Sequence, residues 1–425
     1  MSARLTGLTA RALSLVALAL FLGVLTGRPE LFLVALPLLI RLLSVARATG
    51  PPDYVLTHEI STARLFEGDR LTVTVTLAAR SRVPLLELLE PLPAFVELAS
   101  GHNRALFSLE AGERGEWTYE LRCTRRSCLT LGAVQARIWE RCGLRVRERQ
   151  HSDPKAVRVY PGVAPLRHVP PPLRTQTAFG NYVSPALGSG LEPAEIRPFA
   201  PGDPLRHVNW RASLRLGKLY VTQHHPERNA DVVLMLDTLS QVGVPPATSL
   251  DLCVRAAAAL ARAYLARKDR VGLIDYGGVF RWVKPTSGPA QLERLLDALV
   301  AAEPVFTYVR KDLALVPPRV LPPEALVIAL SPLLDPRFVE AAGDLAARGF
   351  DLVVLSVSPV ALTRAMLPPS PLTDLACRLW ALERRAQLAE LRRRGLVVLD
   401  WSPEQPLALA LVPLGRRRRR TAIAG

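Results

Sequence analysis

The chain has 425 residues, 49% of them hydrophobic, and a formal net charge of +16. This length exceeds one ordinary domain, so we expect two or three folded units, each with an apolar core. The excess of cations favours an anionic lipid surface or an acidic partner. The sequence contains no zinc-finger spacing and no basic motif interleaved with aromatic residues, so we expect no nucleic-acid partner.

Two uncharged apolar runs lie near the amino terminus, at residues 12–27 and 31–40. A helix that crosses the hydrocarbon core needs about 20 residues, so we expect flanking residues to extend both runs, with Arg11 and Arg41 reaching toward the headgroups. A cleavable signal peptide is the competing interpretation, because cations precede the first run. The second run argues against cleavage, since the mature chain would then begin with an exposed apolar segment. We therefore predict a transmembrane hairpin at residues 1–50.

The cations of this hairpin lie at its two outer ends, at Arg4, Arg11, Arg41 and Arg47. The turn between the runs carries only Arg28, which Glu30 offsets. The positive-inside rule therefore places both ends, and the body that follows, on the cytoplasmic side of the plasma membrane.

The cysteines are five, an odd number for a chain of this length, which does not indicate a disulfide framework. The spacing of Cys123, Cys128, Cys142 and His151 matches no standard zinc pattern. We interpret these cysteines as small apolar side chains on strands.

Short alternating segments follow the hairpin, at residues 71–77, 117–121 and 133–139. Strict alternation of apolar and polar residues is typical of half-buried strands, and glycine-containing turns separate them. Residues 51–160 are therefore predicted to form an antiparallel β-sandwich. Prolines and glycines then interrupt residues 161–190, which we predict to be a linker.

From residue 231 onward, apolar strands and helices alternate. The expected strands are residues 232–236, 271–275, 325–330, 352–357 and 396–400, and the expected helices are residues 248–267, 289–301, 336–348 and 373–394. Thr248 and Asp251 form a capping box at the first of these helices. The alternation predicts a doubly wound parallel sheet, with helices on both faces, within residues 191–415. A basic tail at residues 416–425 follows, and its arginines could contact anionic headgroups.

A polar, turn-rich segment, residues 201–211, precedes the first of these strands. Proline fixes φ and glycine supplies unusual dihedrals, so we expect a shaped loop here and no helix. The apolar strand at residues 232–236 then ends at Asp237, where an open α/β sheet presents a site. The ordered set of polar and aromatic positions is Glu195, Arg197, Phe199, Gly202, Asp203, Arg206, Trp210, Arg211, Glu227, Arg228 and Asp237.

This ordered set resembles the bacterial family known as domain of unknown function 58, most densely over residues 155–280. Together with the alternating elements, the resemblance implies a von Willebrand factor A-like domain within residues 191–415, preceded by a β-sandwich. It also implies a partner, because such proteins look like companions of MoxR-type AAA+ ATPases, which remodel or help assemble other proteins. The chain has no P-loop, so we expect any ATP to be bound by the partner.

In von Willebrand factor A-type domains, an Asp-x-Ser-x-Ser motif after the first strand binds a divalent metal. Asp237 is present here, but leucine and glutamine occupy the two serine positions, and Ser240 is out of register by one residue. A second acid normally follows the central strand, where Ser331 leads and Asp335 lies further out. Because hard cations require six or more oxygen ligands, we expect no resident cofactor. The alternative is a degenerate Mg²⁺ site at Asp237, Ser240 and Asp335.

Catalysis is the competing interpretation of the polar segment. No G-x-S-x-G elbow and no H-E-x-x-H motif occurs in the sequence. His207, His224 and His225 lie near Asp203 and Asp237 in the sequence, so a metal-dependent hydrolase that uses Asp237 at the sheet edge is the alternative function.

The structural interpretation of the segment is a clasp, in which Asp203 pairs with an arginine and Trp210 is packed. We expect a non-enzymatic, cytoplasm-facing adaptor that is anchored in membrane lipid and works with a MoxR-type AAA+ ATPase in protein assembly or remodelling. The residues assigned to partner binding or to the clasp are Glu195, Arg197, Gly202, Asp203, Arg206, Trp210, Arg211, Glu227 and Arg228.

Overall fold

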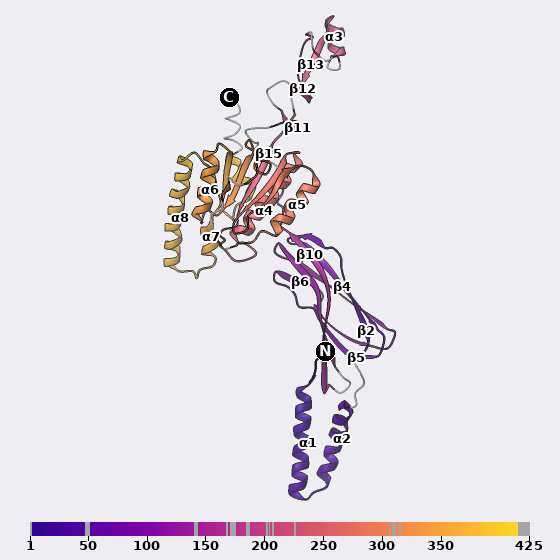
Figure 1. The fold of residues 1–425 in the computed structure, drawn as a ribbon. Helices are drawn as coiled ribbons and strands as arrows, with labels where there is room; N and C mark the ends of the chain where they lie inside the picture. Colours follow the sequence, from indigo (N-terminus) through magenta and orange to yellow (C-terminus); the bar gives the residue numbers. More distant parts are fainter. Residues whose placement is uncertain are drawn as a thin grey trace. The chain divides into compact units, whose positions relative to one another are not determined.

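The computed structural model divides the chain into two compact units, Met1–Tyr160 and Pro161–Gly425, shown in Figure 1. The residues that it describes are 2–46, 52–139, 143–166, 169–170, 176–183, 188–200, 203, 205, 208–224, 227–305, 307, 312–313 and 316–414.

Two apolar helices open the first unit, α1 (Gly7–Thr26) and α2 (Glu30–Ala46). They pack closely where a Cβ at Gly23 would lie 3.1 Å from the ring of Phe32. Of the helices in the described ranges, α1 is long and apolar enough to cross a membrane, judged by length and composition. The helix α2 has 17 residues and contains Pro37.

Two β-sheets form the rest of the first unit. The first has the strand order β2 (Tyr54–Ile60), β4 (Arg70–Ala79), β8 (Arg114–Cys123) and β6 (Val96–Ser100). The second has the order β1 (Ser2–Leu5), β10 (Arg145–Tyr160), β9 (Ser127–Trp139), β5 (Val83–Leu89) and β7 (Arg104–Leu109), with β3 (Arg64–Phe66) beside β10. The expected alternation is present in β4, where Leu71, Val73, Val75 and Leu77 are buried. These side chains join residues of both sheets in one core.

A buried polar cluster lies within this apolar core. The Glu90 carboxylate accepts hydrogen bonds from His58 Nε2 at 3.0 Å, from the Gly132 amide at 2.8 Å and from the Tyr119 hydroxyl. Gly132 has φ of 94°, and a Cβ there would lie 2.1 Å from the Asp153 carbonyl oxygen, so only glycine fits. Burial raises the pKa of Glu90, but the hydrogen bonds outweigh it and hold that pKa below its ordinary value.

A six-stranded sheet forms the centre of the second unit, and its strands are parallel except for one edge strand. The antiparallel edge strand is β17, next to β16. The order across the sheet is β17 (Arg281–Thr286), β16 (Arg270–Tyr276), β15 (Asp231–Asp237), β18 (Leu326–Ser331), β19 (Asp351–Val357) and β20 (Val397–Trp401). The direction of winding reverses between β15 and β18, and such a switch point is where open α/β sheets place a site.

The helices of the second unit are α4 (Ser249–Ala266), α5 (Pro289–Val300), α6 (Pro336–Ala347), α7 (Pro359–Arg364) and α8 (Pro371–Arg393), with the shorter α3 (Trp210–Leu216) ahead of them. The predicted capping box at Thr248 and Asp251 starts α4. Residues of α6 and α8 share a core with Val233 and Met235 of β15. The intervening residues of β15 are also buried, so both faces of that strand are covered.

Two predictions about irregular structure were wrong. The expected linker contains the strand β11 (Gln176–Val183) and the start of β12 (Gly188–Pro198). These strands form because each pairs with a strand that lies further along the chain. Their partners are β14 (Glu227–Asn229) and β13 (Tyr220–His224), respectively. The segment predicted to contain no helix includes the start of α3, since Asn209 supplies a side-chain cap there.

Candidate functional site

An ion pair closes the polar segment that follows β12. The Arg197 guanidinium donates to both oxygens of Asp203, each at 2.7 Å, and the Ala200 amide donates to Oδ2 at 2.8 Å. The side chain of Arg197 is 31% exposed and that of Asp203 is 16% exposed. The expected pairing of Asp203 with an arginine is present, and it is bidentate, a geometry that fixes the loop as well as neutralising the charge.

The helix α3 is held against β13 by side-chain hydrogen bonds. Asn209 Oδ1 accepts from the Ala212 amide at 3.0 Å, while its Nδ2 donates to Thr222 Oγ1 at 3.0 Å. The Ser213 hydroxyl donates to the Asn209 carbonyl at 2.8 Å and accepts from the Tyr220 amide at 2.9 Å. These hydrogen bonds hold together the lobe formed by β12, α3 and β13, which Figure 1 labels.

The predicted packing of Trp210 is wrong, because its side chain is 60% exposed. Trp210 is the first residue of α3, and the side of that helix turned toward β13 carries Ser213 instead. Arg211 is exposed as well. Gly202 and Arg206 lie outside the described residues, as do the side chains of Glu195, Glu227 and Arg228, whose backbones are in β12 and β14.

At the switch point, β15 ends in a buried carboxylate. Asp237 Oδ2 accepts from the Ser331 hydroxyl of β18 at 2.5 Å, and Oδ1 accepts from the Leu239 amide at 3.0 Å. Burial raises the pKa of Asp237 to about 7, although both hydrogen bonds act in the opposite direction. The nearby Asp335 carboxylate raises this pKa further. A large share of Asp237 is therefore protonated at neutral pH.

The other proposed metal ligands do not complete a site with Asp237. Asp335 caps α6, and Arg337 donates to its two carboxylate oxygens at 2.9 and 2.6 Å. Arg337 also donates to the Thr307 carbonyl. Ser240 Oγ is buried and has no hydrogen-bond partner. In the described part of the chain, no three His, Cys, Asp or Glu residues could hold a metal together, so this donor set does not fit a hard cation.

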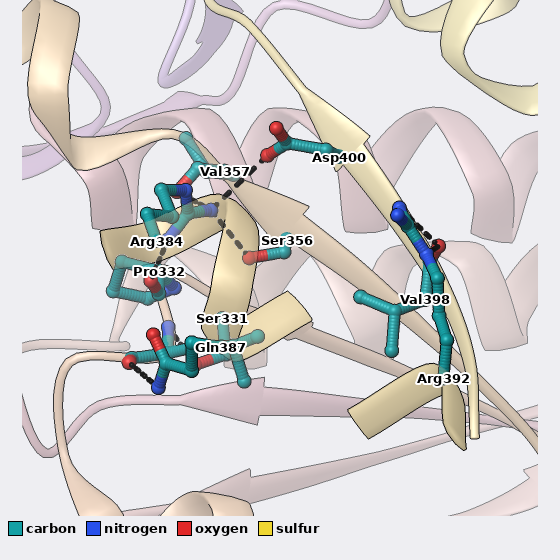
Figure 2. Close-up of polar contacts among 10 residues, drawn as sticks. Ser331, Pro332, Ser356, Val357, Arg384, Gln387, Arg392, Val398 and Asp400 are labelled. Atoms are coloured by element: carbon teal, nitrogen blue, oxygen red, sulfur yellow. Dashed lines mark hydrogen bonds and ion pairs between the residues drawn. The ribbon is translucent and has the colours of Figure 1, made fainter. Parts of the chain in front are cut away.

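A buried guanidinium that the sequence did not indicate lies at the same edge of the sheet. Arg384 of α8 is 4% exposed and lies among the carboxyl ends of β18, β19 and β20, as Figure 2 shows. It donates to Ser356 Oγ at 2.7 Å, to the Pro332 carbonyl at 3.0 Å and to Asp400 Oδ1 at 3.2 Å. No signal in the sequence separates it from the many exposed arginines of α8.

Three carboxylates at or just after the ends of β16, β18 and β20 each pair with an arginine. Asp400 pairs with Arg384, Asp335 pairs with Arg337, and Asp275 of β16 pairs with Arg281 at 3.2 Å. Asp275 also accepts from the Thr238 hydroxyl at 2.5 Å. The carboxyl edge therefore consists of acceptors that are already hydrogen-bonded to side chains of the same chain. His207 and His225 lie outside the described residues, as does the side chain of His224.

Comparison with known proteins identifies a family for part of the second unit. Residues 195–376 match the family described as "Protein of unknown function DUF58". This region belongs to the DUF58 family. The chain is 26% identical over 278 residues to Uncharacterized protein Rv1480 of Mycobacterium tuberculosis, covering 58% of this chain and 85% of that protein. It is 21% identical over 271 residues to Uncharacterized protein YeaD of Bacillus subtilis, covering 61% and 67%.

Two solved structures resemble part of the chain weakly. The cupredoxin domain of amoB from Nitrosocaldus yellowstonii aligns with a TM-score of 0.18 and 12% identity, covering 25% of this chain and 86% of that domain. The C-terminal domain of wzt aligns with a TM-score of 0.19 and 6% identity, covering 27% and 81%. These scores are too low to assign a fold or a function to the chain.

Proposed function

We propose that this DUF58 protein is a membrane-anchored, cytoplasm-facing adaptor that works with a MoxR-type AAA+ ATPase in the assembly or remodelling of other proteins. The observation that carries the proposal is the state of the carboxyl edge. Asp237 is buried and hydrogen-bonded to Ser331, and the neighbouring carboxylates are paired with Arg281, Arg337 and Arg384. An edge whose described carboxylates are held by hydrogen bonds and ion pairs supports a fixed shape for recognition.

The proposed domain types follow from strand order and composition. The strand order of the second unit fits a doubly wound, von Willebrand factor A-like domain. Its winding reverses between β15 and β18, and one edge strand is antiparallel. Two mainly antiparallel sheets over one core fit a β-sandwich. In the hairpin, exposed apolar side chains cover α1 and α2, among them Leu15, Phe21, Val24 and Leu33. Such helices fit lipid, with both termini in the cytoplasm.

The alternative, a metal-dependent hydrolase that uses Asp237, fits the geometry less well. A catalytic metal needs charged oxygen ligands and an open position for water or substrate. Asp237 is fully buried, and the two carboxylate oxygens of Asp335 accept from Arg337. The adaptor is therefore the function that we put to the test.

The test is direct binding to the MoxR-type ATPase of the same organism. The full chain is purified in mild detergent and immobilised, and binding of the purified ATPase is followed with ATP, with ADP and without nucleotide. We expect saturable binding that depends on the nucleotide, because AAA+ proteins change shape with nucleotide state. The same chain tested alone should hydrolyse no ATP. The absence of binding in every nucleotide state would refute the proposed partnership.

A further inference from the structure

The helix α3 has an unusual distribution of side chains. Its small polar residue, Ser213, is buried, while Trp210, Leu214 and Leu216 are 60%, 85% and 56% exposed. Leu219, which follows the helix, is exposed too. A water-facing helix normally shows the reverse pattern, and clustered exposed apolar residues mark an interaction surface.

The charges around these apolar residues are of one sign. Arg211, Arg215 and Lys218 are exposed. The sequence from residue 204 to residue 226 contains no aspartate and no glutamate. A complementary partner must therefore bring carboxylates around an apolar contact, since like charges opposite these cations would oppose binding.

We propose that this surface, named the α3 face and formed by Trp210, Arg211, Leu214, Arg215 and Lys218, binds an acidic surface of a protein. The inference rests on the proposed adaptor function and adds to it the place and chemistry of the contact. Tryptophan and arginine are the residues that most often dominate protein–protein binding energy. An exposed tryptophan flanked by arginines is suited to enter an apolar pocket that is bordered by carboxylates.

The way the α3 face is held favours a protein over a lipid surface. The bidentate Arg197–Asp203 pair, the Asn209 cap and the Ser213–Tyr220 hydrogen bond all fix its geometry. A rigid surface lowers the entropic cost of docking against a shaped partner, whereas a fluid bilayer requires no fixed arrangement. The helix is also only 7 residues long, which gives it little apolar area to insert between lipids.

The test measures binding of the full chain in detergent to the purified MoxR-type ATPase. Leu214→Asp and Arg215→Glu are compared with Leu379→Asp and Arg378→Glu, which change an exposed leucine and an exposed arginine on α8. We expect each α3 variant to weaken binding by about tenfold or more, as removal of an interface anchor does. We expect the α8 variants to bind like the parent chain. Raising the salt concentration should weaken the complex of the parent chain more than the complex of Arg215→Glu, which lacks one of the cations.

The outcomes separate this inference from the adaptor proposal. If the parent chain binds the ATPase and the α3 variants bind equally well, the α3 face is not the contact and the inference is overturned, while the adaptor stands. If the parent chain does not bind, both are overturned. Vesicles of phosphatidylglycerol and of phosphatidylcholine provide the lipid arm. Loss of phosphatidylglycerol binding in the α3 variants, with ATPase binding intact, would assign the face to lipid and overturn the inference.

Discussion

Asp237 keeps the acid expected at the end of β15, but its carboxyl oxygens are used in hydrogen bonds within the protein. Its carboxyl group lies at the switch point, but burial raises its pKa to about 7. The oxygens that a metal would need accept instead from Ser331 and from the Leu239 amide. The sequence indicated a degenerate site through its lost serines, but it gave no sign of Arg337, whose role depends on the local geometry of α6.

The raised pKa of Asp237 has a consequence for stability. A carboxyl group whose pKa is higher in the folded state than in the unfolded state contributes stability below its unfolded pKa, near 3.8, and loses it as the pH rises through about 7. Asp237→Asn mimics the protonated form and can accept from the Leu239 amide and donate to Ser331. We expect the variant to be more stable than the parent chain at pH 8, with a difference that shrinks as the pH falls and is small near pH 4. Urea denaturation at both pH values measures this, and a variant destabilised at pH 8 would contradict it.

Two residues of the polar segment, Asp203 and Trp210, should differ in how truncation of the side chain changes local stability. Asp203→Ala removes the acceptor of Arg197 and of the Ala200 amide, and we expect a local loss of about 1 kcal/mol, reduced by the partial exposure of the pair. Trp210→Ala is the matched control, because its exposed side chain can be lost with little change in stability. Hydrogen exchange of the β12 and β13 amides should accelerate only in Asp203→Ala. Equal acceleration in both variants would show that Trp210 is packed after all.

At the level of elements, a strand or helix can be predicted from the sequence when contacts between nearby residues create it, and it is missed when contacts between distant residues create it. The strand β4 and the parallel strands carry their pattern within a few residues, so alternation and apolar runs predict them. The strands β11 and β12 exist through pairing with β14 and β13, which follow them at a distance in the sequence. Local proline content therefore predicted a linker where there are strands. The helix α3 was missed for a related reason, since Asn209 stabilises its start through Thr222 as well.

The buried cluster within the two sheets gives a prediction for acid stability. The pKa of Glu90 is lower in the folded state than its ordinary value near 4.5, so the cluster contributes stability above that pH and loses it as the pH falls through the folded pKa. Glu90→Gln cannot accept in the same way from His58, Tyr119 and Gly132. We expect this variant to be clearly less stable at pH 7, with the difference shrinking below pH ~4. Denaturation curves of both proteins across this range test it. A constant difference would mean that Glu90 acts through packing alone.

At the scale of the whole molecule, the charge pattern at the amino terminus connects the fold to the proposed function. An adaptor for an ATPase that needs ATP must present its large second unit to the cytoplasm. The sequence provides cations at both outer ends of the hairpin and a nearly neutral turn. Among the helices of the described ranges, α1 alone meets the length and composition expected of a membrane span, so α2 (Glu30–Ala46) needs its flanking residues to complete the proposed second crossing.

The orientation can be tested in cells with reporters that work on only one side of the membrane. A reporter fused after Gly425 should be active in its cytoplasmic form, and one inserted between Arg28 and Pro29 should be active in its external form. If α1 alone crossed the membrane, both fusions would lie on the same side, because no second span would then separate one fusion point from the other. Replacing Arg41 and Arg47 with glutamine removes the cations that the positive-inside rule uses to place the second end in the cytoplasm, so we expect mixed orientation of the first unit. A carboxyl-terminal reporter active only outside the membrane would exclude a cytoplasmic ATPase as the partner.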